Sequence, residues 1–255
     1  MALVMLAVGA FVFVSLQFLR APYGKYADKA AWFLGPPING RVAWLLQELP
    51  SFVIPAWLWW SEASTSGANA VLLTTLSPNT VLLALFLAHY AHRTFIFPFR
   101  LRGGKPTPFI IAALAFAFCT WNGTMQGLYL TRVMNASDAS LSSPNMIAGI
   151  VVFFIGAAIN LHADTVLLNL RKPGDPGYYI PTGGLFTWVS AANFFGEIVE
   201  WAGWAIASGS LPGAAFAVFT LCNIGPRGAQ HHAWLQQKFG DKYPRQRKAV
   251  IPFIW

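Results

Sequence analysis

The sequence is poor in charged residues and in cysteine. Asp, Glu, Lys and Arg make up 10% of the 255 residues, whereas a soluble domain carries roughly a quarter. Hydrophobic residues make up 56%, and apolar runs recur along the whole length. This composition excludes an ordinary soluble domain and predicts an all-α integral membrane protein.

Missing motifs exclude several kinds of site. Cys119 and Cys222 have no CxxC or histidine spacing, so we expect reduced packing residues rather than metal ligands. The pair His231-His232 lacks a third ligand at a sensible spacing, so no metal site is predicted. No GxGxxG motif follows a strand, which excludes a Rossmann domain.

Windows of about 19 residues predict seven transmembrane helices. The last of them is short and has soft boundaries. Because the connections are brief, we expect one membrane domain, residues 1–255, without a soluble appendage. The predicted helices are Leu3–Leu19, Val42–Trp60, Thr80–Phe99, Phe109–Leu130, Met146–His162, Phe186–Ala207 and Leu211–Ile224.

The distribution of Lys and Arg orients these helices, because cytoplasmic loops are basic. With the N-terminus outside, only Arg132 of the 17 Lys and Arg residues falls in an outer segment. The C-terminus is then cytoplasmic. This topology and anionic lipid headgroups account for most of the net charge of +8, which therefore does not indicate nucleic acid binding. The inner cations are Arg20, Lys25, Lys29, Arg41, Arg93, Arg100, Arg102, Lys105, Arg171, Lys172, Arg227, Lys238, Lys242, Arg245, Arg247 and Lys248.

Polar residues within the apolar helices indicate a functional site, because each ionisable group in lipid costs several kcal/mol. In the sixth predicted helix, Asn193, Glu197 and Glu200 recur at spacings of four and three and share one face. Such a face can bind a ribose or a carboxamide. The alternative is a structural polar cluster between helices.

Glu48 and Tyr90 are candidates for carbonyl activation. Glu48 is the only acid in the second predicted helix, and a carboxyl group in an apolar wall tends to stay protonated and to donate a hydrogen bond. Tyr90 lies in His89-Tyr90-Ala91-His92-Arg93. A phenol beside a protonated carboxyl group can polarise and protonate a carbonyl oxygen. A helix-packing acid and an interfacial aromatic remain the alternatives.

Two inner segments combine cations with turn residues. The loop from Asp164 to Gly184 carries Arg171 and Lys172 among glycines and prolines, and it can bring amides and a guanidinium to phosphates. The C-terminal segment from Arg227 to Lys248, taken alone, predicts a surface-bound amphipathic helix.

Several long motifs resemble one known family. They include Leu-Arg-Lys-Pro-Gly at 170–174, Gly-Gly-Leu-Phe at 183–186 and Ala-Asn-Phe-Phe-Gly-Glu at 192–197. The chain resembles the membrane steroid 5α-reductases, or 3-oxo-5α-steroid 4-dehydrogenases, including the mammalian type 1 and type 2 forms, over most of its length after residue 40. The resemblance implies a seven-helix enzyme, expected as a monomer, that reduces the 4,5 double bond of testosterone-type or progesterone-type steroids. NADPH would enter from the cytoplasm at loops of about 163–185 and 225–255.

The resemblance also implies roles for individual residues. Glu48 and Tyr90 would hold the C3 carbonyl, because hydride arriving at C5 pushes negative charge onto that oxygen. Trp44, Phe118 and Asn223 would contact the substrate. The residues expected around NADPH, whose cations suit its phosphates, are Arg93, Asn160, Asp164, Arg171, Tyr178, Asn193, Glu197, Arg227 and His231.

Departures from the family pattern leave the natural substrate open. In the family pattern a Tyr usually follows the aromatic residue after the paired histidines, whereas here Leu235 follows Trp234. An aromatic residue is also commoner at the position of Asn223. A reductase of another lipid enone or polyprenol, and an isoprenylcysteine-type methyltransferase that uses S-adenosylmethionine, are the alternatives. Methyl transfer does not need Glu48 or Tyr90, and a non-enzymatic lipid carrier leaves the polar residues unexplained. The host membrane, bacterial inner membrane or endoplasmic reticulum, is also open.

Overall fold

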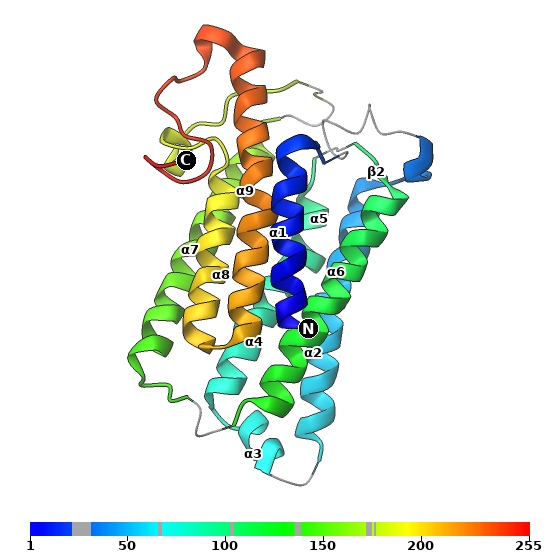
Figure 1. The fold of residues 1–255 in the computed structure, drawn as a ribbon, viewed down its shortest axis with the longest axis vertical. Coiled ribbons are helices and arrows are strands. Elements are labelled where there is room, and N and C mark those ends of the chain that lie inside the picture. The colour runs from blue at the N-terminus through cyan, green and yellow to red at the C-terminus, as the bar shows by residue number, and fades with distance from the viewer. Residues whose placement is uncertain (22–31, 66–67, 103–104, 136–138, 172–174, 176) are drawn as a thin grey trace. The chain divides into compact units, whose positions relative to one another are not determined.

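The computed structural model describes residues 1–21, 32–65, 68–102, 105–135, 139–171, 175 and 177–255. Over these residues the chain is mostly helical, which confirms the all-α prediction, and the strands described there are the two-residue β1 and β2 (Figure 1). The elements are α1 (Ala2–Phe18), β1 (Pro37–Ile38), α2 (Gly40–Ala63), α3 (Ala68–Thr74), α4 (Pro78–Ala91), α5 (Phe97–Arg100), β2 (Thr107–Pro108), α6 (Phe109–Leu128), α7 (Pro144–Asn169), α8 (Ala192–Ser208) and α9 (Leu211–Phe239).

Each of the seven predicted spans overlaps a long helix. A π-helical turn, His92–Ile96, joins α4 to α5, and a second one, Tyr129–Val133, extends α6. Three helical runs among the described residues are long and apolar enough to cross a membrane: Pro78–Arg100, Phe109–Val133 and Pro144–Asn169. The sidedness of the membrane stays a prediction, and three of its inner cations, Lys25, Lys29 and Lys172, lie outside the described residues.

The sixth predicted helix begins later than expected. Phe186 lies in a short 3-10 turn, Gly184–Thr187, and α8 begins only at Ala192. The intervening backbone bonds to the C-terminal segment instead, because the amides of Ser190 and Ala191 donate to the carbonyl groups of Lys248 and Ala249. A distant part of the chain therefore sets this helix boundary.

The last helix is longer than predicted, and the C-terminal segment is not a separate surface helix. α9 continues through Pro226 to Phe239. Proline removes one backbone hydrogen bond from a helix, but Gly225, Pro226 and Gly228 are all buried by packing against neighbouring residues. Leu235 is buried in the same way. This packing keeps α9 helical beyond the predicted end at Ile224.

The chain divides into two compact units. The first comprises Met1 and Pro22–Ile147, in which α2 packs along α6 and α4 packs on α2. α2 and α6 approach closely at Gly123, where a Cβ atom would lie 3.0 Å from the Pro50 carbonyl oxygen and from the Ser51 Cα. The Ser51 hydroxyl donates to the carbonyl of Cys119 at 3.0 Å. Small residues and a buried hydroxyl thus hold α2 against α6.

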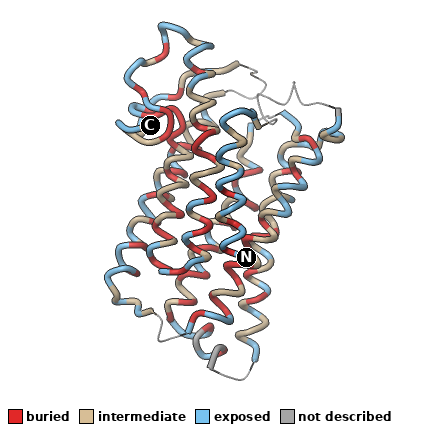
Figure 2. The backbone as a smooth tube through the Cα atoms, in the orientation of Figure 1, coloured by how far each residue is buried: buried red, intermediate tan, exposed pale blue. Residues whose placement is uncertain are grey.

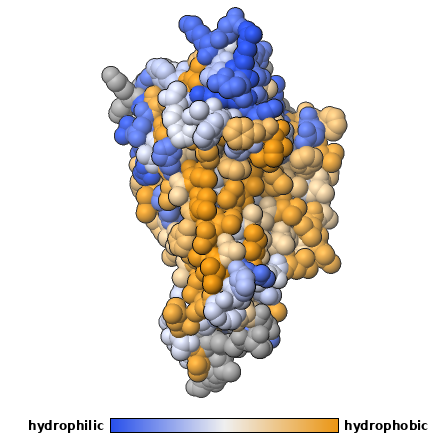
Figure 3. All heavy atoms as spheres, turned by 90° about the vertical axis from the view of Figure 1, so that its left-hand side faces the viewer, coloured by the Kyte–Doolittle hydropathy of each residue, from blue (hydrophilic) through white to orange (hydrophobic). Residues whose placement is uncertain are grey.

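The second unit comprises Ala2–Ala21 and Ala148–Trp255. In it, α1 and α8 pack on α9, and buried positions recur along these helices (Figure 2). α7 meets α8 at Gly156 and Gly196, where a Cβ atom would come within 3.0 Å of the facing backbone. Apolar side chains such as Val151 and Phe154 of α7 are exposed, and Figure 3 shows an apolar surface across the middle of the face that it views. That surface is typical of a lipid-facing helix bundle.

Candidate functional site

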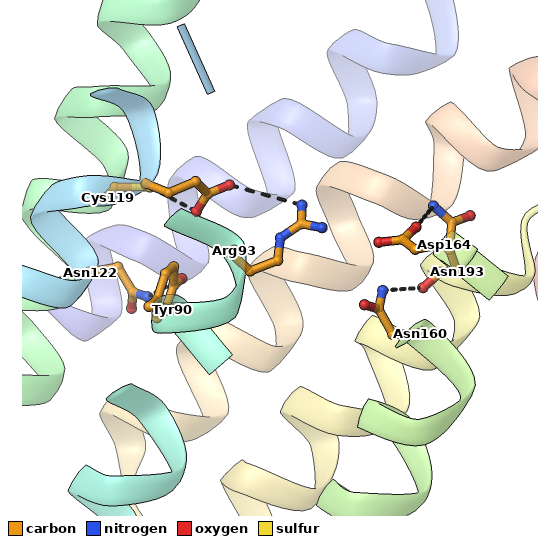
Figure 4. A network of polar contacts seen from close by, with 8 residues as sticks. Tyr90, Arg93, Cys119, Asn122, Asn160, Asp164 and Asn193 are labelled. Atoms are coloured by element: carbon orange, nitrogen blue, oxygen red, sulfur yellow. Dashed lines mark hydrogen bonds and ion pairs between the residues drawn. The ribbon is translucent and has the colours of Figure 1, made fainter. Parts of the chain in front are cut away.

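Glu48 on α2 and Arg93 after α4 lie together in the first unit. Nη2 of Arg93 is 3.9 Å from Oε1 of Glu48, and Sγ of Cys119 on α6 is 3.9 Å from Oε2 of the same carboxyl group (Figure 4). The side chains of Arg93 and Glu48 are 11% and 19% exposed. Three elements therefore converge on one largely buried carboxyl group.

The π-helical turn presents Arg93 to two aromatic rings. Its Cζ lies 4.7 Å from the ring centroid of Trp44 and 4.7 Å from that of Phe97. Cation–π attraction stabilises a guanidinium in such a place. The indole Nε1 of Trp44 is buried and has no hydrogen-bond partner among the described residues. Trp44 was expected to contact substrate, and it lies with Glu48 and Arg93 in this unit.

Tyr90 is buried at the end of α4, with 4% of its surface exposed. Its ring packs 4.7 Å from that of Phe86. Nδ2 of Asn122 donates to the Tyr90 hydroxyl at 3.4 Å (Figure 4). Nε2 of Gln126 donates to Oδ1 of Asn122 at 3.3 Å. Neither Asn122 nor Gln126 was among the site residues predicted from the sequence. Two amides four residues apart in an apolar helix were the available signal.

In the second unit, three of the residues expected around the cofactor contact one another. Nδ2 of Asn193 in α8 donates to Oδ1 of Asp164 in α7 at 3.1 Å, and Nδ2 of Asn160 donates to the Asn193 carbonyl at 2.9 Å (Figure 4). Asn160 and Asp164 are both 3% exposed. A buried set of amide and carboxylate groups of this kind can bind hydroxyl and carboxamide groups.

Aromatic rings and cations gather near Tyr178 in the same unit. The Arg171 Cζ lies 4.5 Å from the Tyr178 ring centroid, and the Trp234 ring lies 4.9 Å from it. The His231 ring stacks on Trp234 with an interplanar angle of 9°. Nζ of Lys238 is 5.2 Å from the Tyr178 ring. Trp234 and Lys238 were not among the predicted cofactor residues, although they lie one and two helical turns from His231.

Arg227 is a buried cation on α9, beyond the predicted membrane span Leu211–Ile224. Burial lowers the pKa of its guanidinium to about 10, so the group stays charged at neutral pH. Its Cζ lies 5.5 Å from the Phe194 ring. A buried positive charge suits an anionic ligand.

Hydrogen bonds of two buried hydroxyl groups, those of Ser190 and Tyr243, connect the C-terminal segment to α9. The Ser190 hydroxyl bonds with Nδ1 of His232 and, at 2.6 Å, with the Tyr243 hydroxyl. Burial lowers the pKa of His232, and the charge of Lys248 lowers it further. Nη1 of Arg247 donates to the Pro181 carbonyl at 2.9 Å. The bond between Arg247 and Pro181 joins the two predicted cofactor loops.

The remaining predicted residues are divided between the units. Phe118 lies on α6 in the first unit, and Asn223 lies half-buried on α9 in the second. Glu197 follows Asn193 by one turn of α8. Among the residues that the structure describes, no group of three His, Cys, Asp or Glu side chains is placed to hold a metal ion.

Comparison with known proteins gives close relatives. A family model described as 3-oxo-5-alpha-steroid 4-dehydrogenase matches residues 105–255. The chain is 49% identical over 248 residues to 3-oxo-5-alpha-steroid 4-dehydrogenase 1 of Bos taurus. This match covers 97% of the chain and 93% of that protein. The chain is 44% identical over 249 residues to the type 1 protein of Homo sapiens, with 98% and 92% covered. It is 45% identical over 236 residues to the human type 2 protein, with 91% and 87% covered.

The similarity runs through both compact units, and the family model alone matches more than half of the chain. The resemblance inferred from the motifs is thereby confirmed. The chain belongs to the 3-oxo-5-alpha-steroid 4-dehydrogenase family, and it is an oxidoreductase.

Proposed function

We propose that this chain is an NADPH-dependent reductase of the 4,5 double bond of 3-oxo-4-ene steroids of the testosterone or progesterone type, with 5α-dihydro products. The observation that supports this most directly is that Tyr90 is buried and Glu48 largely buried in the first unit of a chain 49% identical to a protein named for this reaction. Both side chains can donate a hydrogen bond to a carbonyl oxygen.

The chemistry that needs these donors is charge development at the C3 oxygen. NADPH, when bound, supplies a hydride to C5. As C5 is reduced, the electrons of the conjugated system move to the C3 oxygen, and the substrate becomes an enolate or enol. Tyr90 and a neutral Glu48 would donate to that oxygen, which lowers the barrier because the interaction strengthens as the charge grows. C4 then takes a proton, which completes the reduction.

Residues of the second unit fit the cofactor. Arg171, Arg227 and Lys238 supply positive charge for the pyrophosphate and the 2′-phosphate. The rings of Tyr178 and Trp234 offer apolar faces beside two of these cations. Asn160, Asp164 and Asn193 supply donors and acceptors for ribose hydroxyls or a carboxamide. We further propose that Glu197 and His231 belong to this set. These residue types suit the groups that NADPH presents.

The position of Arg93 adds a condition to the role of Glu48. We propose Arg93 as a further cofactor residue, and its guanidinium lies 3.9 Å from the Glu48 carboxyl group. The proposed donor role requires the neutral form of Glu48 when substrate is bound.

The protein is proposed to work as a monomer in a bacterial inner membrane or the endoplasmic reticulum, with the cofactor loops in the cytoplasm. The 16 Lys and Arg residues on one side support this orientation. The apolar helices Pro78–Arg100, Phe109–Val133 and Pro144–Asn169 support the membrane location.

The test is incubation of the purified, detergent-solubilised protein with testosterone and either NADPH or S-adenosylmethionine, with mass spectrometry of the products. We expect a gain of two hydrogens that depends on NADPH and is abolished in Tyr90→Phe. Transfer of a methyl group from S-adenosylmethionine instead would reject the reductase. NADPH binding without steroid reduction would reject the steroid and direct the search to other lipid enones.

A further inference from the structure

We infer that Asn122 on α6 is a positioning residue for Tyr90, and that its side-chain amide orients the phenol proton toward the substrate carbonyl. The inference rests on the proposed function. Nδ2 of Asn122 lies 3.4 Å from the Tyr90 hydroxyl oxygen, and Asn122 has no exposed surface. A buried amide is costly in an apolar helix unless its groups are satisfied, so its place beside a proposed proton donor calls for a role.

The hydrogen bonds run in one direction. Nε2 of Gln126 donates to Oδ1 of Asn122 at 3.3 Å, so the nitrogen of Asn122 faces Tyr90. An amide nitrogen donates and does not accept. The phenol oxygen must therefore accept this hydrogen bond, and its single proton cannot be given to Asn122. In this chain of hydrogen bonds from Gln126 through Asn122, the Tyr90 hydroxyl accepts from Asn122 and can donate its proton only to a different group.

The packing of α6 keeps Asn122 in place. Its neighbour Gly123 is pressed against Pro50 and Ser51 of α2, where a Cβ atom would lie at 3.0 Å. Ser51 also bonds to the Cys119 carbonyl, one turn before Asn122. Glu48 lies only two residues before Pro50. The contact between α2 and α6 therefore constrains the backbone near both Asn122 and Glu48. Because Tyr90 bonds to Asn122, α6 contacts the segments that carry both proposed carbonyl donors.

The effect should appear in turnover rather than in binding. As the C3 oxygen draws on the Tyr90 proton, negative charge spreads to the phenol oxygen, and the hydrogen bond from Asn122 strengthens. A donor that faces developing charge directly is worth about 100- to 1000-fold in kcat. Because Asn122 acts through Tyr90, we expect a smaller loss, about tenfold, when its donor is removed.

The kinetic test compares Asn122→Leu and Asn122→Asp with wild type in testosterone reduction. Asn122→Leu should lower kcat about tenfold and leave KM for testosterone and NADPH within about twofold. In Asn122→Asp an ionised carboxylate would accept the phenol proton, so kcat should be low at neutral pH. It should recover as the pH falls, because the protonated carboxyl group can donate again. Thr120→Ala, which removes a different polar group from α6, the Thr120 hydroxyl, is the matched control.

Two outcomes would overturn the inference: wild-type kcat in Asn122→Leu, or equal losses at all pH values in Asn122→Asp. A rise in KM alone would also overturn it, because that result describes a packing role. A second readout does not need turnover. With 3-fluorotyrosine at position 90, the fluorine NMR signal should shift in Asn122→Leu and not in Thr120→Ala.

An unshifted fluorine signal would overturn the contact itself, whatever the activity. A shifted signal in a protein that binds NADPH but reduces no steroid would instead reject the proposed reaction, and with it the role of Asn122 in that reaction, while the hydrogen bond stands. The two failures are therefore distinguishable. The thermal stability of each variant, measured in the same detergent, separates misfolding from a specific loss.

Discussion

Nη2 of Arg93 lies 3.9 Å from Oε1 of Glu48, and the guanidinium of Arg93 packs against the rings of both Trp44 and Phe97. The two rings limit where the cation can move. This positive charge lies beside the carboxyl group that the proposed reaction needs as a hydrogen-bond donor. The state of this carboxyl group is therefore the first property to test.

Replacement of Glu48 separates the donor role from the charge. Glu48→Gln keeps a hydrogen-bond donor and loses the ionisable group, so it should retain part of the activity if the neutral form is the working one. Glu48→Leu should lose nearly all of it, on the order of 100-fold or more in kcat. Steady-state kinetics with testosterone and NADPH would measure both.

The matched control is Glu62→Gln, because Glu62 is a carboxylate at the other end of α2 and is paired with Arg132. Glu62→Gln should leave kcat unchanged. Equal and intact activity in Glu48→Gln and Glu48→Leu would remove Glu48 from the mechanism. Loss of all activity in Glu48→Gln would indicate that the ionised carboxylate beside Arg93 is the working form.

The stability of the second unit should depend on pH through His232. Burial, and then the charge of Lys248, lower the pKa of His232 in the folded protein. Below its unfolded pKa of about 6.5, the unfolded chain binds a proton that the folded protein binds less readily. Unfolding therefore becomes easier as the pH falls through about 6.5.

We expect the melting temperature in detergent to fall by a few degrees between pH 7.5 and pH 5.5, and the fall to be smaller in His232→Gln. The comparison concerns the slope with pH, because His232→Gln also loses its bond to Ser190 and starts less stable. Tyr243→Phe removes a neighbouring bond but leaves the histidine, so it should keep the wild-type slope. A wild-type slope in His232→Gln would refute the assignment.

The positions of the helices followed from hydropathy, because each apolar run is long enough to form one helix whose side chains are buried or face lipid. Two boundaries did not follow. α8 begins at Ala192 because Ser190 and Ala191 bond to the C-terminal segment, and no local pattern encodes a partner about 60 residues away. α9 continues beyond Ile224 because its residues around Pro226 are buried, whereas Gly225, Pro226 and Arg227 indicate, from the local sequence alone, the end of an apolar span.

The candidate site was predicted from two different sources. The cost of polar groups in an apolar helix marked Glu48, Asn193 and Glu197 from the residues themselves. The roles of the cofactor residues came from family resemblance. Neither source identified Asn122 or Lys238, because their significance depends on contacts with Tyr90 and Tyr178 that only the folded chain creates.

Arg171 gives the sharpest test of the proposed cofactor loop. Its Cζ lies 4.5 Å from the Tyr178 ring, which holds the guanidinium in place for a phosphate. A charge-assisted hydrogen bond is worth about 1.5–3 kcal/mol, so Arg171→Ala should weaken NADPH binding about 10- to 100-fold. The steroid KM should not change, and Arg171→Lys should recover only part of the loss, because lysine lacks the bidentate geometry.

Binding of NADPH and NADH to each variant would be measured by fluorescence titration. If Arg171 meets the 2′-phosphate, Arg171→Ala should lose affinity for NADPH and leave NADH unaffected. If it meets the pyrophosphate, both dinucleotides should lose affinity. Arg245→Ala is the matched control, because Arg245 is an exposed cation paired with Asp241 and should change neither. Unchanged affinity for both dinucleotides in Arg171→Ala would reject the loop as a cofactor site, since a guanidinium in contact with a phosphate cannot be removed without cost.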